Sequence, residues 1–341
     1  MSSTLESQSI TRLRNPGNSN SLRPPVRRAV AVVLLLLCAT SLSAAGDLYP
    51  IPTDAPASGA SPGAPPTAAI TLPDNTSVTN RVERKLRWRN TAVIGGATLA
   101  VGVYGAKHWW STEVTTSFGT RNEGGFGQGT NAGGADKLGH AFTTYSGTRI
   151  LARAFEGLGN TPAQSLRLAG WTSLGILTGV EVMDGFSSKW RFSREDALFN
   201  AAGVAVALLL EKHPSIDALL DFRLLYRRSE EDRLRGQTSP TGDYSGQTYL
   251  LAFKADGVPM LRDVPLVRYL ELLAGYGARG YEVQRNPHRR VYYGVGVNLS
   301  RVLGDTLFRG DLKGGKVEGA TDTLLELFEV PGTAALTDRR L

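Results

Sequence analysis

The sequence predicts an α+β protein in which a compact bundle of about four apolar helices is followed by a small antiparallel β-sheet. The helices are indicated by long apolar stretches between residues 92 and 212, which are separated by glycine-rich or proline-containing breaks. The sheet is indicated by segments between 246 and 303 that alternate or are rich in Tyr, Val and Gly. At 341 residues, the chain has room for two modest domains with flexible segments around them.

The first 45 residues have the three-part layout of a secretory signal peptide. A pair of arginines precedes the apolar run at 29–37, and small residues follow as far as Ala45, after which we expect cleavage. An uncleaved membrane anchor is the alternative. The only cysteine, Cys38, lies in this segment, so no disulfide is expected within the mature chain. Leu37 stands where a lipoprotein signal has a small residue, and acylation of Cys38 is therefore not predicted.

The net charge of +7 does not indicate a nucleic-acid partner. Five arginines of the predicted signal are opposed there only by Glu6, so the mature chain carries about +3. The remaining sequence lacks a basic stripe with interleaved aromatic residues, which a nucleic-acid surface would need. We expect a membrane or envelope component as the partner, and a protein partner remains open.

The mature chain divides into four parts by composition. Residues 46–79 form a linker rich in Pro, Ala and Ser that we expect to be disordered. A helical domain is expected at 80–215, and a connector with a small β-rich region at 216–305. The C-terminal tail, residues 306–341, contains one amphipathic run, TDTLLELFEV.

Four helical segments are expected in the helical domain. A charged start at 80–90 leads into an apolar helix that ends near 106, and further helices are expected at about 136–156, 163–186 and 194–212. The last two are apolar nearly all round and should be buried in protein or in lipid. Their uninterrupted apolar runs are shorter than the ~20 residues of a spanning helix, which favours a compact bundle embedded in or lying on a membrane.

The β-rich region begins after a charged stretch. Residues 215–240 are read as a solvated helix or connector. Strands are expected within 246–255, 267–283 and 290–303, which makes three or four strands that dock as a sheet against the helices.

The first candidate site residues are Asp136 and His140, which are four residues apart and share one helix face. A neighbouring carboxylate fixes a histidine tautomer and raises its basicity, as in a general base or beside a metal. The alternative is that Asp136 caps the helix and His140 is merely packed. Tyr145 and Arg149 lie further along the same segment.

Two more polar pairs lie on the following helices. Glu181 and Asp184 are near the end of an apolar helix, where an unpaired carboxylate would cost several kcal/mol, so they need partners. Asp196 and Asn200 repeat the spacing of four after Ser193, a good N-cap. The candidate partners of the carboxylates are Lys137, His140, Arg149 and Arg194.

Three polar pairs in apolar helices have three interpretations. They form a polar network that specifies packing, or a metal site built from one imidazole and several carboxylates. The third interpretation is an acid/base centre for hydrolysis or acyl transfer on a lipid or wall precursor. Cofactor and metal content stay open among these, and the candidate catalytic residues are His140, Asp136, Glu181, Asp184 and Asp196.

The order of these motifs resembles that of a bacterial family of predicted periplasmic lipoproteins, domain of unknown function 2279. The matching stretches are Asn122-Glu123-Gly124, GGADKLGHAFTTYSGTR at 133–149, Glu181-x-x-Asp184-Gly185-Phe186-Ser187, and Phe192-Ser193-x-x-Asp196-x-x-x-Asn200-x-x-Gly203. The resemblance covers about residues 80–215. Candidate binding residues within it are Glu123, Lys137, Tyr145, Arg149 and Asn200.

A fainter similarity runs to VanZ-like membrane proteins, which share Asp-Lys-x-x-His, a later glutamate and Asp-x-x-x-Asn-x-x-Gly. Together these resemblances imply an exported protein of the periplasm, associated with the inner or outer membrane. The first functional hypothesis is a bundle that binds a lipid, a cell-wall component or a protein partner. The second is an envelope hydrolase or transferase that uses His140 with Glu181, Asp184 and Asp196 as acid/base groups or metal ligands.

Overall fold

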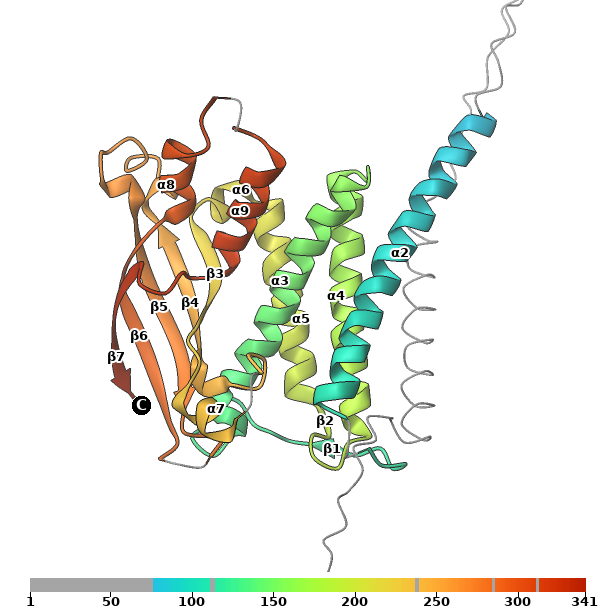
Figure 1. The fold of residues 1–341 in the computed structure, drawn as a ribbon, viewed down its shortest axis with the longest axis vertical. Helices are drawn as coiled ribbons and strands as arrows, with labels where there is room; N and C mark the ends of the chain where they lie inside the picture. Colours follow the sequence, from blue (N-terminus) through green and yellow to red (C-terminus); the bar gives the residue numbers. More distant parts are fainter. Residues whose placement is uncertain (1–75, 111–113, 237–238, 284–285, 311–312) are drawn as a thin grey trace, which may run out of the picture.

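The computed structural model describes residues 76–110, 114–236, 239–283, 286–310 and 313–341. The predicted signal peptide lies outside these ranges, as does the predicted linker except for its last four residues. Within them the fold is α+β, as predicted: four long helices stand beside a five-stranded antiparallel sheet (Figure 1).

The bundle consists of α2 (Thr76–His108), α3 (Ala135–Gly157), α4 (Pro162–Gly185) and α5 (Arg194–Lys212). The starts and ends of α3, α4 and α5 agree with the predicted segments to within one residue. As expected, Ser193 caps α5, since its hydroxyl accepts a hydrogen bond from the amide of Asp196 at 3.1 Å.

α3 is the central helix of the bundle, because it packs along both α4 and α5 while α2 leans on α4 (Figure 1). Among the described helices, none has the combination of length and apolar character that crossing a bilayer requires. One core of the bundle joins α2, α3 and α4 and contains Ile94, Ala152, Phe155, Leu168 and Ala169.

The sheet consists of β3 (Leu220–Tyr226), β4 (Gln247–Lys254), β5 (Leu270–Arg279), β6 (His288–Val297) and β7 (Ala334–Arg340). The strands pair in sequence order, and every pair is antiparallel. The shorter helices around the sheet are α6 (Pro214–Asp217), α7 (Glu230–Arg235), η2 (Tyr244–Gly246), η3 (Ala255–Gly257), η4 (Val267–Tyr269), α8 (Leu299–Thr306) and α9 (Lys316–Leu327).

Three details of the β-rich region differ from the sequence prediction. The stretch 215–240 is not only a solvated connector, because it contains β3, whose charged residues Asp221 and Arg223 are buried. The segment 290–303 is strand only as far as Val297; the side chain of Asn298 then caps α8. The C-terminal tail contributes β7, the fifth strand of this sheet.

Aromatic side chains join the bundle to the sheet. Phe142 and Tyr145 of α3 pack against Phe222 of β3, with ring centroids 5.6 and 5.5 Å apart, and Phe142 also packs against Tyr249 of β4. Gly139 permits this approach, since a Cβ there would lie 2.9 Å from the hydroxyl of Tyr249. The N-terminal half of α3 is therefore enclosed between the other helices and the sheet.

The glycine-rich segment before α3 is folded against its N-terminus. The short strands β1 (Thr120–Arg121) and β2 (Phe192–Ser193) pair in parallel, next to the start of α5. A turn of 3-10 helix, η1 (Asn131–Gly134), then leads into α3, and Gly134 has a φ of 91°, in the left-handed region that favours glycine. This path brings the loop residues Glu123 and Asn131 to the first turn of α3.

Candidate functional site

Lys137 lies at the centre of a group of buried polar residues. Its ammonium Nζ is 2.5 Å from Oε2 of Glu123, 3.0 Å from Oδ2 of Asp136 and 2.6 Å from Oδ1 of Asp196. The Lys137 side chain is fully buried. It therefore links the glycine-rich loop, α3 and α5 through one cation. We call the following residues the polar cluster: Glu123, Asp136, Lys137, His140, Glu181, Asp196 and Asn200.

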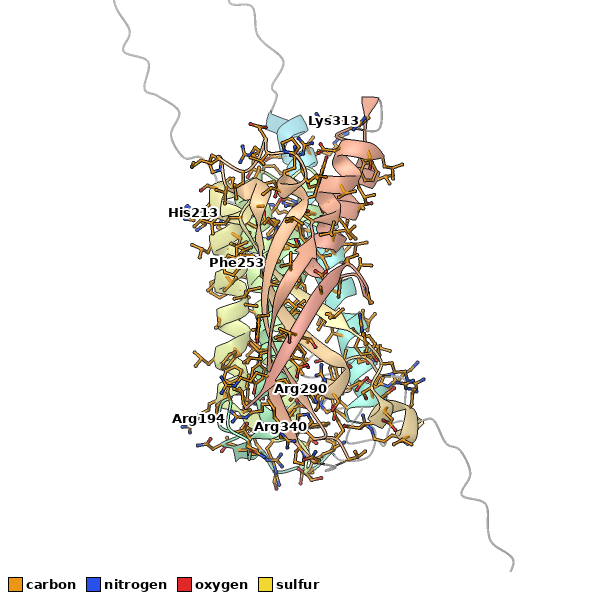
Figure 2. All side chains as sticks on the ribbon, turned by 90° about the vertical axis from the view of Figure 1, so that its left-hand side faces the viewer. Arg194, His213, Phe253, Arg290, Lys313 and Arg340 are labelled. Carbon is orange, nitrogen blue, oxygen red and sulfur yellow. The ribbon has the colours of Figure 1, made fainter. Side chains whose placement is uncertain are left out.

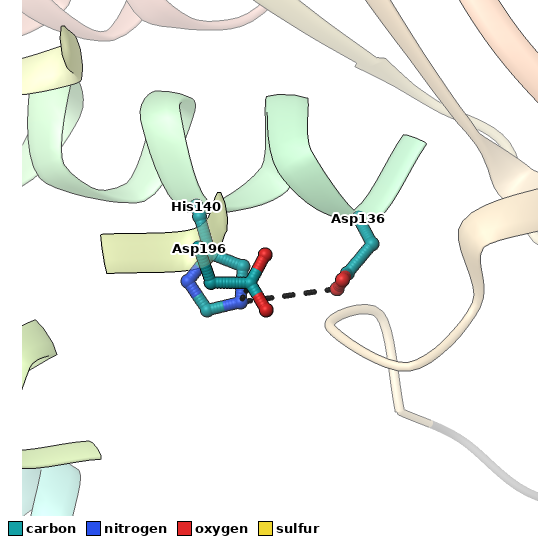
Figure 3. Close-up of side chains that lie close together, drawn as sticks. All are labelled: Asp136, His140 and Asp196. Atoms are coloured by element: carbon teal, nitrogen blue, oxygen red, sulfur yellow. Dashed lines mark ion pairs between the residues drawn. The ribbon is translucent and has the colours of Figure 1, made fainter. Parts of the chain in front are cut away.

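His140 faces four other helix-borne members of the polar cluster. Its Nδ1 lies 3.2 Å from Oδ1 of Asn200 and 3.4 Å from Oε1 of Glu181. Its Nε2 lies 3.8 Å from Oδ1 of Asp136 and 3.9 Å from Oδ1 of Asp196 (Figure 3). With 18% of its side chain exposed, His140 is the most accessible of these groups.

Asp136 is held by residues that the sequence did not single out. Tyr244 donates its hydroxyl to Oδ1 at 2.6 Å, and Asn131 donates its amide to Oδ2 at 2.9 Å. The N-cap of α3 is Gly134, without a side-chain cap bond, so the reading of Asp136 as a helix cap is wrong. Asn131 and Tyr244 lie in short 3-10 turns, where no hydrophobic periodicity points to a buried site. The only signal for them in the sequence is that they stand among turn-forming residues.

Glu181 and Asp184 have different surroundings. Oε2 of Glu181 accepts a weak hydrogen bond from the amide of Ser193 at 3.4 Å, whereas Oε1 has no hydrogen-bond donor among the described residues and faces His140. Asp184, at the end of α4, accepts from Nε1 of Trp110 at 2.6 Å. Of the four candidate partners, His140 is the one that forms an ion pair with either carboxylate in the described part of the chain.

Burial and charge shift the proton equilibria of this region. Burial raises the pKa of Glu181 to about 8 and that of Asp184 to about 7. Burial lowers the pKa of His140, but the carboxylates of Asp136, Asp196 and Glu181 outweigh it and the net pKa is raised. The pKa of Asp136 is lowered, because the charges of His140 and Lys137 outweigh its burial. The raised pKa values of Glu181 and His140 both favour the protonated forms of these two groups, which lie 3.4 Å apart.

A metal ion is one conceivable occupant of the polar cluster. Asp136, His140 and Asp196 each offer a ligand atom, and these atoms lie within 4.8 Å of one another. One imidazole and two carboxylates are a donor set suited to Zn²⁺. However, the ammonium of Lys137 already supplies a positive charge to both carboxylates, and its pKa is raised by them. A divalent ion would therefore have to bind beside a buried cation, which the geometry disfavours.

A cavity of about 390 Å³ opens beside the polar cluster, between the bundle and the sheet. Its wall includes Asp136, His140, Asp184 and Asp196, and also Glu123, Asn131, Arg191 and Gln247. Much of the remaining wall is apolar and includes Phe142, Leu177, Val180, Leu224 and Phe328. An apolar pocket with a few convergent polar groups is the usual form of a small-molecule site.

Tyr145 and Arg149, two candidate binding residues, lie outside the polar cluster. Arg149 is buried and forms ion pairs with Asp217 at 2.6 Å, Glu326 at 2.9 Å and Glu211 at 3.3 Å. It also donates to the hydroxyl of Tyr145. These contacts tie α3 to α5, α6 and α9, which indicates that Arg149 joins the bundle to the elements around the sheet.

The polar cluster is built from segments that also match a known family. Residues 122–212 match the profile of a family described as predicted periplasmic lipoprotein (DUF2279), a shorter span than the 80–215 expected from the motifs. No curated protein and no solved structure matches the chain. The family description agrees with the exported, membrane-associated periplasmic location predicted from the sequence.

The match contains every motif that carried the resemblance, from Asn122 to Gly203, and it includes all seven members of the polar cluster. Residues 122–212 of this chain are therefore similar to the family described as predicted periplasmic lipoprotein (DUF2279).

Proposed function

We propose that the protein binds an amphiphilic component of the cell envelope in the cavity between the bundle and the sheet. The observation that carries this proposal is a largely apolar cavity wall that also contains His140 and several carboxyl groups. An acyl or other apolar chain fits the part lined by Leu177, Leu224 and Phe328, and the head group then meets the polar cluster.

The charge of the polar cluster limits the head group. Four carboxyl groups surround two basic residues, Lys137 and His140, and the cavity wall adds a fifth carboxyl group, that of Asp184, and a third basic residue, Arg191. Such a surplus of hydrogen-bond acceptors favours a head group that donates, such as an ammonium or a hydroxyl group, and disfavours an anion.

Three single-chain amphiphiles with the same tail test this proposal: decylamine, decanol and decanoate. Trp109 and Trp190 line the cavity, so their fluorescence reports binding below the concentration at which each compound aggregates. We expect decylamine and decanol to bind and decanoate to bind at least about tenfold more weakly, which corresponds to ~1.4 kcal/mol. Equal binding of the amine and the carboxylate would contradict the proposed head-group preference.

A variant pair on one helix tests the location of binding. Thr143→Trp places a large ring at an exposed position of the cavity wall, and Ile150→Trp places the same ring at an exposed position of α3 outside it. Decylamine binding should be lost in Thr143→Trp and kept in Ile150→Trp. If both variants bind as the unaltered protein does, the cavity is not the binding site.

The contact between His140 and Glu181 favours a second function, that of an envelope hydrolase or transferase. A general base works best with a pKa near the working pH, and burial brings Glu181 into this range beside a histidine on the cavity wall. In this function His140 contacts the substrate, while Glu181 takes up or returns the proton. The acyl ester p-nitrophenyl decanoate is a suitable probe.

The enzymatic function predicts hydrolysis of this ester above the buffer rate, and a loss of at least about a hundredfold in His140→Gln. Binding of decylamine by His140→Gln separates loss of catalysis from loss of the fold. A metal analysis of the unaltered protein and of His140→Ala tests whether the polar cluster binds a metal ion. A bound ion that disappears in the variant would assign His140 as its ligand. Hydrolysis equal to the buffer rate in the unaltered protein would leave binding as the function.

A further inference from the structure

The sheet exposes apolar side chains and buries charged ones along the same strands. In β5, Leu270, Leu272 and Ala274 are exposed, whereas the intervening Glu271 and Leu273 are buried. Because side chains alternate across a strand, the two sets point to opposite faces of the sheet. The exposed set of β5 belongs to the outward face, which is the face that also carries Phe222 and Tyr249 against α3; the exposed residues lie where α3 does not cover it.

The buried face of the sheet carries a dense network of ion pairs. Arg223 of β3 lies 2.6 Å from Asp221, 2.7 Å from Glu271 and 3.0 Å from Glu329, and Lys254 lies 2.6 Å from Asp221. At most 10% of any of these side chains is exposed. The cost of burying these charges is offset by their mutual pairing.

The outward face carries apolar residues on three adjacent strands. Phe253, Leu272 and Val295 stand directly opposite one another across β4, β5 and β6, and Leu270 stands opposite Val297. Leu272 is 63% exposed and Phe253 is 43% exposed. We call the following residues the outer apolar face: Leu251, Phe253, Leu270, Leu272, Tyr293, Val295 and Val297.

This distribution of apolar and charged side chains is the opposite of the one in an antiparallel sheet that has one face in water. Such a sheet sends polar side chains outward and apolar ones inward. Here the face turned away from α3 takes the buried charges, and the outward face takes the aliphatic and aromatic residues, some of them against α3 and others exposed, so the outer apolar face is matched to an apolar environment.

Basic residues flank the outer apolar face at one end of β6 and β7. Arg289 alternates in step with Val291 and Tyr293, and Arg339 stands opposite Val291, so these two lie on the outward face; Arg290 and Arg340 stand opposite each other on the other face. Asp338, which pairs with Arg290 at 2.9 Å, is the acidic residue within these two strands. Figure 2 shows Phe253 at mid-height, with Arg290 and Arg340 towards one end of the molecule and Lys313 at the other. A positive end beside an apolar band is complementary to anionic lipid head groups above acyl chains.

We propose that the outer apolar face lies against the acyl chains of a membrane, with Arg289 of β6 and Arg339 of β7 at its anionic head groups. This surface is separate from the cavity beside His140, and the proposal does not depend on the function of that cavity. It assigns the face by which the protein meets the membrane, which the location in the envelope alone does not specify.

Flotation with vesicles gives the first test. The exported protein is mixed with vesicles of phosphatidylglycerol or of phosphatidylcholine, and its share in the floating fraction is measured. We expect stronger flotation with phosphatidylglycerol, and binding at least about tenfold weaker in Leu272→Glu. Leu234→Glu is the matched control, because Leu234 is 64% exposed but lies on α7, and it should float as the unaltered protein does.

A fluorescent label gives a second test that an acyl anchor elsewhere in the chain would not affect. In a Cys38→Ser background, a polarity-sensitive dye is attached at Leu272→Cys or at Leu234→Cys. Vesicles should shift the emission of the dye at 272 to the blue, and brominated acyl chains should quench it, with no effect at 234. A dye at 272 that remains water-like on vesicles would overturn the proposal. A blue shift that depends on protein concentration without vesicles would also overturn it and would assign the face to a second copy of the chain.

Discussion

The ammonium of Lys137 lies 2.6 Å from Oδ1 of Asp196 and joins α3 to α5 in the interior of the protein. The same ammonium is held by Asp136 on its own helix and by Glu123 from the glycine-rich loop. Because three carboxylates share one buried cation, this contact organises the polar residues of the cavity wall as well as the packing of the two helices.

Replacing Lys137 should therefore destabilise the protein strongly. Lys137→Met keeps much of the aliphatic volume but leaves Glu123, Asp136 and Asp196 without their ammonium, and a cost of ~3–5 kcal/mol is expected. Urea denaturation measures the change. Lys85→Met, at an exposed position of α2, should stay within about 0.5 kcal/mol of the unaltered protein. If Lys137→Met were equally stable, the three carboxyl groups would not need this cation.

The stability of the protein should fall as the pH rises from about 5 to 9. The pKa of Glu181 is raised to about 8 and that of Asp184 to about 7, so the folded protein holds protons that the unfolded chain has released above about pH 5. This stabilisation is complete below the ordinary carboxyl pKa and is lost as the pH passes through 7 and 8. The raised pKa of His140 acts in the same direction.

Denaturation midpoints of the unaltered protein and of two variants, measured between pH 5 and pH 9, test whether stability falls as the pH rises. Glu181→Gln should flatten the pH dependence, because the amide mimics the protonated acid at every pH. Glu230→Gln, at an exposed position of α7, should leave the profile unchanged. A profile that rises towards pH 9 in the unaltered protein would contradict the direction of these pKa shifts.

The helices of the bundle could be predicted because their signals are local. Apolar stretches of helical length define α4 and α5, Ser193 marks the start of α5 as a cap, and the spacing of four placed Asp136 and His140 on one face of α3. The geometry now places His140 beside carboxylates from two other helices.

Other parts of the structure could not be predicted from the sequence, because they depend on contacts between distant residues. β3 buries Asp221 and Arg223 in a network completed by residues far along the chain, so its charges resemble those of a solvated connector. Tyr244 reaches Asp136 across 108 residues of sequence, and no local periodicity signals such a contact. The separation of Arg149 from the polar cluster depends on α6 and α9, whose positions follow from the tertiary fold.

Because Arg149 lies in an ion-pair network away from the cavity, its replacement should lower the stability of the protein without changing ligand binding in the cavity. Arg149→Met leaves Asp217, Glu326 and Glu211 without the guanidinium, and a cost of about 3 kcal/mol is expected because the arginine is buried. The surface variant Arg153→Met should cost less than about 1 kcal/mol. Folded Arg149→Met should bind decylamine with unchanged affinity, whereas weaker binding would connect Arg149 to the cavity.

Gly203 allows the close approach of α5 to α3 on which the polar cluster depends. A Cβ at this position would lie 2.0 Å from the carbonyl oxygen of Ala141 and 2.3 Å from the hydroxyl of Thr144, too close for any side chain. Gly203→Ala should therefore push the two helices apart and weaken the contact between Lys137 and Asp196, at a cost of ~1–3 kcal/mol or more.

A second helical glycine provides the matched control for this variant. Gly175 lies within α4, and nothing approaches its Cβ position within 4 Å, so Gly175→Ala should gain about 0.5–1 kcal/mol from the better helix propensity of alanine. Denaturation curves of both variants measure the difference, which should have opposite signs at the two positions. A stabilised Gly203→Ala would mean that α3 and α5 do not pack at the separation described here, and the convergence of Asp136, His140 and Asp196 would then have to be abandoned.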